Sequence, residues 1–224
     1  MAKTINLGVL GIDHGHIFDM LDEMLKEGCS CNYFWTEGSP LTLDEFSKKY
    51  PQIKRVDNKS DILNDDTIDM ILISSIPKDR ANLSIDAMKA GKDVMVDKPG
   101  CTTLEQLNNL KQTVKDTGKI WSINFSERFH VAAVTKAEEL VAEGKIGKVK
   151  QTIGTGPHRQ GNYERPDWFY DRDSYGGIIT DIGSHQIHQF LVFTNSNEAK
   201  INHALAENTT KTVSYTHLRA HETV

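Results

Sequence analysis

A glycine-rich stretch near the N-terminus has residue types and spacing suited to binding the diphosphate of a dinucleotide. Gly8 lies inside an apolar run, Ile5 to Leu10, and Gly11 and Gly15 fall between this run and an amphipathic stretch that begins at Ile17. In such a context glycines let the backbone approach a pyrophosphate at the N-terminus of a helix. The residues therefore predict a nucleotide-binding turn, with a plain tight turn as the alternative.

The turn departs from the full glycine fingerprint. A G-x-G-x-x-G pattern that begins at Gly11 requires glycine at the positions of Asp13 and His16, so only its first glycine is kept. We expect His14 and His16 to line the nucleotide turn.

An acidic residue beyond the turn fits the same chemistry. Glu37 ends the second predicted strand, where a carboxylate can accept hydrogen bonds from both ribose hydroxyls of NAD and repel the 2′-phosphate of NADP. A surface glutamate in an EGSP turn is the alternative. Together the turn and the acid predict a dinucleotide site that takes NAD, with NADP less favoured.

A carboxylate and an imidazole in the second half of the chain are spaced to interact. Asp181 and His185 are four residues apart, so on a helix the carboxylate can orient the imidazole and stabilise its charged form. A packing histidine is the alternative. His185 and His188, with Asp181, also allow a metal interpretation, but no second cluster supports it and we expect no metal.

The segment before this pair has a composition suited to a polyol. A loop from Thr155 to Tyr175 is longer than most connections inside a domain, which indicates a binding segment. It carries Arg159, Trp168 and Tyr175, and aromatic faces pack against sugar C–H groups while charged side chains bind hydroxyls. We expect a sugar, a sugar acid or a cyclitol, with a solvated surface loop as the alternative.

The elements that must position these residues alternate between strand and helix as far as Phe125. The expected strands are Ile5–Leu10, Tyr33–Trp35, Met70–Ser74, Asp93–Val96 and Ile120–Phe125. The expected helix starts are capping boxes at Thr42 with Glu45 and at Thr102 with Glu105, and a cap at Asp79. This rhythm predicts an α/β fold with a doubly wound parallel sheet and helices on both faces.

The rhythm changes after Phe125. One helix carries Val131 to Val141, and strands are expected near Val149–Ile153 and at Lys200–Glu207, on either side of the long loop. We therefore expect one domain over residues 1–124 and a second over residues 125–212.

Composition excludes several classes of function. The net charge is −5, from 26 Lys and Arg against 31 Asp and Glu, so no basic field favours nucleic acid or anionic lipid. No apolar run reaches the length of a membrane span and no leader segment is evident. The 3 cysteines suit a reducing compartment, and Cys29 and Cys31 lack the second pair that a zinc site needs. We expect a cytoplasmic protein.

Two segments together resemble the glucose-fructose oxidoreductase/inositol dehydrogenase (Gfo/Idh/MocA) family. AGKDVMVDKPG (90–100) matches the family's Glu-Lys-Pro strand end, with Asp97 in place of Glu. YGGIITDIGSHQIHQF (175–190) matches its helix motif at Gly176, Gly177, Asp181, Gly183 and His185. The NFSERF segment (124–129) and the GKIG turn keep the family order.

The resemblance implies a Rossmann domain followed by an α+β domain with an open, mostly antiparallel sheet, which carries a homo-oligomer interface. It implies that Lys98, Asp181 and His185 are catalytic. His185 would take the proton of a substrate hydroxyl while hydride leaves for the nicotinamide, and Lys98, before a cis Pro99, would stabilise the alkoxide. The implied cofactor-binding residues are Gly8, Gly11, Asp13, His14, Gly15, His16, Glu37, Ser75, Pro77, Asp97, Lys98, Pro99 and Asn124. The implied substrate-binding residues are Lys98, Arg128, Arg159, Trp168, Tyr175, Asp181 and His185.

The resulting hypothesis is an NAD(P)-dependent dehydrogenase of a sugar or cyclitol hydroxyl. An NAD-dependent glycoside hydrolase and a non-enzymatic nucleotide-binding regulator are the alternatives.

Residues 213–224 are expected to be a non-native tail, because their codons resemble a sequencing-library adapter. We therefore expect a chain truncated in its second domain, whose first domain binds NAD and whose turnover is poor.

Overall fold

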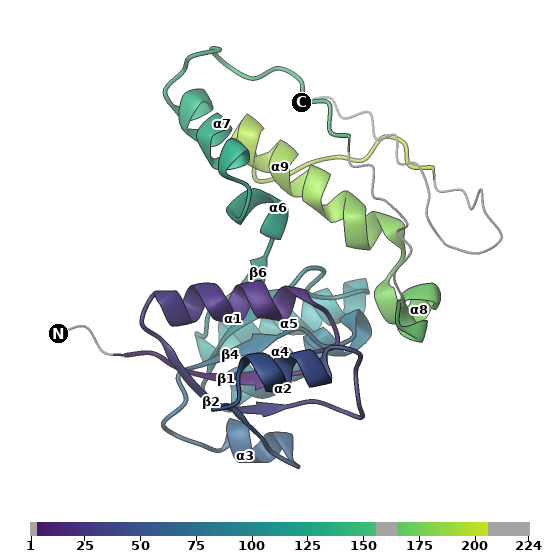
Figure 1. Ribbon diagram of the computed structural model, residues 1–224. Helices are drawn as coiled ribbons and strands as arrows, with labels where there is room; N and C mark the ends of the chain where they lie inside the picture. Colours follow the sequence, from purple (N-terminus) through teal and green to yellow (C-terminus); the bar gives the residue numbers. More distant parts are fainter. Residues whose placement is uncertain (1–3, 156–164, 206–224) are drawn as a thin grey trace. The chain divides into compact units, whose positions relative to one another are not determined.

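The computed structural model describes residues 4–155 and 165–205. The chain forms two compact units. The first contains the described residues up to Asn124 together with Pro166–Tyr175, and the second contains the described residues 125–155, Arg165 and the residues from Gly176 onward. Figure 1 shows the elements of each unit.

The first unit is built on a parallel sheet, as the alternation of strands and helices predicts. Across the described residues the 6 strands run in the order β3-β2-β1-β4-β5-β6. Their bounds are β1 Asn6–Leu10, β2 Ser30–Trp35, β3 Lys54–Arg55, β4 Met70–Ile73, β5 Asp93–Asp97 and β6 Trp121–Asn124. The order reverses between β1 and β4, and in open α/β sheets ligands bind beyond the carboxyl ends of the strands at such a point.

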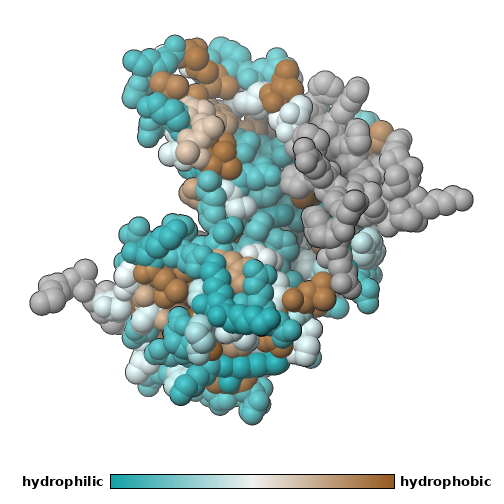
Figure 2. Space-filling model, viewed as in Figure 1, coloured by the Kyte–Doolittle hydropathy of each residue, from teal (hydrophilic) through white to brown (hydrophobic). Residues whose placement is uncertain are grey.

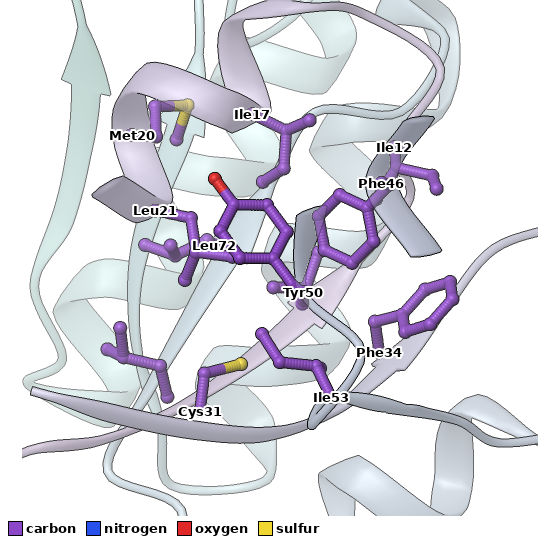
Figure 3. Close-up of a cluster of buried hydrophobic side chains, with 12 residues drawn as sticks. Ile12, Ile17, Met20, Leu21, Cys31, Phe34, Phe46, Tyr50, Ile53 and Leu72 are labelled. Atoms are coloured by element: carbon purple, nitrogen blue, oxygen red, sulfur yellow. The ribbon is translucent and has the colours of Figure 1, made fainter. Parts of the chain in front are cut away.

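Helices cover both faces of this sheet (Figure 1). On one face α1 (His16–Lys26) and α2 (Leu43–Lys49) pack against β1 through Val9. They also pack against β2 and β4 through Phe34 and Leu72 (Figure 3). On the other face α3 (Lys59–Leu63), α4 (Pro77–Lys89) and α5 (Leu104–Thr117) pack against Leu10 and Ile71. Neighbouring strand residues thus point to opposite cores, which is why these strands are apolar along their whole length.

Three of the predicted helix caps are wrong in detail. Thr42 precedes α2 but makes no capping bond, because its hydroxyl donates to the carbonyl oxygen of Ile12. The cap of α5 is Thr103, whose Oγ1 accepts from the Gln106 amide, so that capping box lies one residue later than predicted. Asp79 lies inside α4, which begins at Pro77.

Several short elements of the first unit were not predicted from the sequence, among them a 3-10 helix at Asp167–Tyr170 and α8 (Arg172–Tyr175), which lie within the expected loop. The strand β3 is 2 residues long and α3 is 5 residues long. Neither is long enough to show a period in the sequence.

The second unit is helical over its described residues. Its elements are α6 (Ser126–Phe129), α7 (Ala132–Ala142), a π-helical turn at Ile179–Gly183, and α9 (Ser184–Thr194). The strand predicted near Val149–Ile153 is not formed, and residues 200–205 are also irregular. A strand needs a partner for its backbone groups, and no strand of this unit lies among the described residues.

This second unit buries few apolar side chains. No residue of α7 is buried, and Val131, Leu140 and Ile146 are exposed. Figure 2 shows hydrophobic side chains at its surface.

Several sequence predictions lie outside the described residues. They concern Arg159 and the tail at 213–224.

Among the described residues, none of the helices has both the length and the apolar character needed to span a bilayer.

Candidate functional site

The turn between β1 and α1 is built around Gly11. Gly11 has a φ of 79°, its amide donates to the Trp35 carbonyl at 2.7 Å, and its own carbonyl accepts from the Ser74 amide at 3.2 Å. A Cβ at Gly11 would lie 2.4 Å from the Cβ of Ser75. Both the left-handed backbone and the contact with the end of β4 therefore require glycine.

The other two glycines of the stretch have different surroundings. A Cβ at Gly8 would lie 2.5 Å from Cγ2 of Ile62, so Gly8 lets a helix pack closely against the sheet. Gly15 precedes α1, and a Cβ there would meet no heavy atom within 4 Å. Open space at a helix N-terminus suits an approaching diphosphate. The residues present therefore fit a dinucleotide.

Asn124 and Glu37 lie at the ends of their strands. The Nδ2 donor of Asn124 is buried and has no hydrogen-bond partner among the described residues. Glu37 is exposed, in a loop that Arg55 braces by donating to the carbonyls of Thr36 at 2.9 Å and Gly38 at 2.7 Å. The predicted ribose acceptor is thus held on an ordered loop.

Asp13 lies in the same turn. Burial raises the pKa of Asp13 to about 6, partly opposed by its own backbone hydrogen bond and the charge of Arg80. Burial, opposed by Lys78 and reinforced by the charge of Glu37, raises the pKa of Asp79. The carboxylates of Asp79 and Glu37 therefore repel each other and disfavour a further negative charge next to Glu37.

Asp97, at the end of β5, is the centre of a buried polar cluster that ties the turn to the neighbouring strand. Its Oδ1 lies 2.7 Å from His16 Nδ1, and its Oδ2 lies 3.1 Å from His14 Nδ1 and 3.0 Å from a terminal nitrogen of Arg80. Burial alone would raise the pKa of Asp97, but Arg80 and then the two histidines hold it well below its usual range. The carboxylate is therefore charged at neutral pH.

Arg80 also fixes the backbone that carries Lys98. Its side chain is buried, and it donates to the carbonyls of Ser75 at 2.8 Å and Asp97 at 3.0 Å and to that of Lys98. Lys98 is itself buried, and the peptide bond to Pro99 is cis, as the resemblance implied. Sequence reasoning missed Arg80, although its spacing with Ser84, Ala87 and Met88 places it on the buried face of α4.

The histidine and Asp97 side chains come close enough to hold a metal ion. One ligand atom each from His14, His16 and Asp97 lies within 4.8 Å of the others, and these form the metal-capable group found among residues 4–155 and 165–205. The guanidinium of Arg80 already neutralises this carboxylate, which opposes a divalent cation. The expectation that no metal is bound stays a prediction.

Residues from the predicted binding segment lie on the first unit. The ring of Trp168 lies 6.4 Å from that of His14, centroid to centroid. Tyr175 is buried and stacks on Phe169 at 5.8 Å. Trp168 is therefore next to the nucleotide turn, whereas Tyr175 packs the segment in place.

The second unit holds Asp181 and His185, both buried. Asp181 lies in the π-helical turn and His185 in α9, so the two are not on one regular α-helix as the sequence predicted. π-turns often occur at functional sites. His185 Nε2 lies 4.0 Å from a carboxylate oxygen of Glu127, a neighbour that sequence reasoning missed because it comes from α6.

Two other predicted residues of this unit are engaged in packing or pairing. His188 stacks on Phe125 with centroids 4.0 Å apart, and burial, followed by the charge of Arg128, lowers its pKa. Arg128 forms a two-pronged ion pair with Glu138, at 2.7 and 3.1 Å. Arg128 must leave or share that partner to bind a substrate.

Comparison with known proteins gives matches along most of the chain. The family described as "Oxidoreductase family, NAD-binding Rossmann fold" matches residues 39–125, and the "GFO/IDH/MocA C-terminal domain" matches residues 134–220. A scyllo-inositol 2-dehydrogenase (NADP(+)) of Bacillus subtilis is 24% identical over 97% of this chain and 60% of its own length. A D-xylose dehydrogenase of Paenarthrobacter nicotinovorans is 27% identical over 63% of this chain and 37% of its own length.

Solved structures share the fold. A crystal structure from Erwinia carotovora atroseptica SCRI1043 has a TM-score of 0.90 and 37% identity, over 93% of this chain and 62% of that one. The myo-inositol 2-dehydrogenase of Lactobacillus plantarum has a TM-score of 0.74 at 21% identity, over 93% of this chain and 61% of that one. This chain thus spans about 60% of the length of the Bacillus subtilis relative and 37% of that of the Paenarthrobacter relative.

Proposed function

Because the chain belongs to the Gfo/Idh/MocA family of NAD(P)-dependent oxidoreductases, we propose that it is a dehydrogenase that moves hydride between NAD and a hydroxyl-bearing carbon of a sugar, sugar acid or cyclitol. The observation that carries this proposal is the nucleotide turn. The backbone of Gly11 lies directly against Ser75 at the point where the strand order reverses. Asp97, the residue before Lys98, bonds to His16 of the same turn.

The three predicted catalytic residues and two of their neighbours have distinct roles in this proposal. When bound, the nicotinamide supplies the hydride acceptor. Lys98 donates a hydrogen bond to the substrate oxygen and favours the developing alkoxide, and an imidazole nitrogen of His185 takes the hydroxyl proton. Asp181 and Glu127 stabilise the imidazolium that results. Arg80 holds the Lys98 backbone in one position.

The cofactor preference follows from charge. Glu37 on its braced loop and the carboxylate of Asp79 disfavour an added 2′-phosphate, so NAD is the expected cofactor. Relatives include an NADP(+)-dependent and an NAD(+)-dependent scyllo-inositol 2-dehydrogenase, so comparing NADH with NADPH tests this point directly.

The substrate class rests on the relatives and on Trp168. The names of the relatives include inositol and D-xylose dehydrogenases. An aromatic ring beside the nucleotide turn suits the C–H face of a sugar ring or cyclitol. Residues 125–212 would then belong to the substrate domain and contribute to a homo-oligomer interface, in a cytoplasmic enzyme.

The test is a pair of histidine variants. Single-turnover reduction of NAD by a panel of inositols and pentoses would be compared for the wild type, His185→Ala, and His130→Ala, a control at an exposed position. Losing a general base costs about 10²- to 10⁴-fold in rate. We expect that loss for His185→Ala with NADH affinity retained, and no loss for His130→Ala.

Two results would contradict the proposal. Equal rates for the wild type and His185→Ala would remove His185 from the chemistry. With an aryl glycoside added to the panel, release of the phenol without net NADH would instead identify a glycoside hydrolase.

A further inference from the structure

His16 is held in one orientation by a buried carboxylate. It is the first residue of α1, and its Nδ1 makes a hydrogen bond of 2.7 Å with Asp97 Oδ1. Asp97 is fully buried, whereas the side chain of His16 is 26% exposed. Nδ1 of the imidazole is thus held against a buried group, while part of the His16 side chain remains exposed to solvent.

The chemistry of this bond decides which ring nitrogen carries hydrogen. A carboxylate only accepts hydrogen bonds, so Nδ1 of His16 must donate. A neutral imidazole has one N–H, and the other nitrogen, Nε2, then bears a lone pair. Arg80 keeps the carboxylate charged at its other oxygen, and this preserves the donation from Nδ1.

The lone pair on His16 Nε2 accepts no hydrogen bond from the described part of the chain. No hydrogen bond to its Nε2 is formed by residues 4–155 or 165–205. The neighbouring His14 does not share this property. Its Nδ1 lies 3.1 Å from Asp97 Oδ2 and also accepts a hydrogen bond of 3.3 Å from the His16 amide. The first contact requires a hydrogen on Nδ1 and the second requires a lone pair there, so the two contacts need opposite tautomers. The inference is therefore drawn for His16 alone.

We propose that His16 Nε2 is a hydrogen-bond acceptor for a hydroxyl group of the ligand bound at the nucleotide turn. A lone pair repels the oxygens of a diphosphate but accepts an O–H. The hydroxyl belongs to a ribose of the cofactor or to the polyol substrate, and both present the same chemistry. This inference rests on the proposed function, because that function brings hydroxyl-bearing ligands to the turn.

The first measurement is the tautomer itself. Long-range ¹H–¹⁵N spectra of the wild type at pH 8 would report the protonation of both nitrogens of His16. We expect a protonated Nδ1 and a bare Nε2. A hydrogen on Nε2 would overturn the inference whatever the protein binds.

The second measurement separates the role in binding from the role in folding. His16→Asn keeps a donor near the position of Nδ1, and hence the bond to Asp97, but has no atom at the position of Nε2. His16→Phe loses both groups. We expect wild-type thermal stability for His16→Asn and a loss of stability for His16→Phe, so that a binding defect in His16→Asn reports on Nε2.

Calorimetric titration identifies the source of the hydroxyl. NADH would be titrated into the wild type and His16→Asn, and myo-inositol into each protein saturated with NADH. A neutral hydrogen bond is worth about 0.5–1.5 kcal/mol, so we expect roughly 2- to 10-fold weaker binding of one of these ligands. Weaker NADH binding assigns the ribose, and weaker inositol binding alone assigns the substrate.

The outcomes also separate this inference from the proposed function. Equal affinities of the two proteins for both ligands would overturn the inference and leave the function standing. A wild type that binds no NADH would overturn the function, and with it the inference.

Discussion

At the scale of single residues, Asp13 is a carboxylate whose charge the fold opposes. Its pKa is raised from 3.8 to about 6, chiefly by burial. The folded state thus binds the proton more tightly than the unfolded state does. The resulting stabilisation is complete below about pH 4 and is lost as the pH rises through about 6.

Replacing Asp13 by Asn should therefore stabilise the protein only at high pH. In urea unfolding at a series of pH values, we expect the Asn variant to match the wild type near pH 4 and to exceed it by about 1–3 kcal/mol at pH 8. The exposed Asp57→Asn is the control for removal of a carboxylate. A stability difference for Asp13→Asn that is independent of pH would refute this account of its environment.

Arg80 gives a prediction about a buried charge pair. Arg80→Met leaves Asp97 buried without its guanidinium partner, and such a loss typically costs about 3–5 kcal/mol. Lys59→Met is the control, because Lys59 pairs with Asp86 and both side chains are about 40% exposed. Loss of this exposed pair should lower the free energy of unfolding by less than about 1 kcal/mol. Urea unfolding of both variants gives the two losses in the free energy of unfolding. Equal losses would show that the buried pair with Asp97 is no more important for stability than the exposed pair.

The sequence was enough to predict which residues belong to the candidate site, but not which side chains they contact. Lys98 at a strand end and Asp181 near His185 could be found from their motifs. The bonds from Asp97 to Arg80 and to His16 could not, because they join β5 to α4 and to a turn more than 80 residues earlier in the chain, and spacing carries no signal across that separation.

At the scale of elements, the β1–α1 turn depends on a close approach between two strand ends. Gly11→Ala forces a side chain into a left-handed backbone and places a Cβ 2.4 Å from Ser75. Gly28→Ala is a matched control, since Gly28 has a φ of 86° but open space around it.

We expect unequal effects of these two alanines. Gly28→Ala should cost about 1–2 kcal/mol from backbone strain alone, and Gly11→Ala should cost roughly 1–3 kcal/mol more from overpacking. Urea unfolding compares them directly. Equal losses would mean that the contact with Ser75 relaxes without cost.

Strand and helix positions in the first unit were predictable because each has a strong local signal. The strands are apolar runs, and glycines end helices, as Gly118 does with a φ of 65°. The second unit was harder. The segment near Val149 has β-branched residues that suit a strand, Val149, Thr152 and Ile153, but it has no partner strand among the described residues, and pairing is not encoded locally.

At the scale of the whole molecule, the two units differ in how much they bury. The sheet of the first unit lies between two apolar cores, whereas α7 of the second buries no residue. Resistance to local opening follows buried contacts.

Hydrogen exchange should show this difference. The helices α1 and α7 are both 11 residues long, but α1 buries Ile17, Met20 and Leu21. We expect the amides of α1 and of the central strands to exchange slowly and those of α7 to exchange much faster. Equal protection of α1 and α7 in mass-spectrometric exchange would contradict this view.

The central claim is that this chain transfers hydride from a polyol carbon to NAD. The most direct measurement is to incubate the protein at high concentration with NAD and myo-inositol deuterated at its ring carbons, and to weigh the reduced cofactor by mass spectrometry. The account predicts NADH that carries one deuterium, formed by the wild type and lost in His185→Ala. Deuterium-free NADH, or none from any polyol of the panel while NADH binds normally, would contradict it.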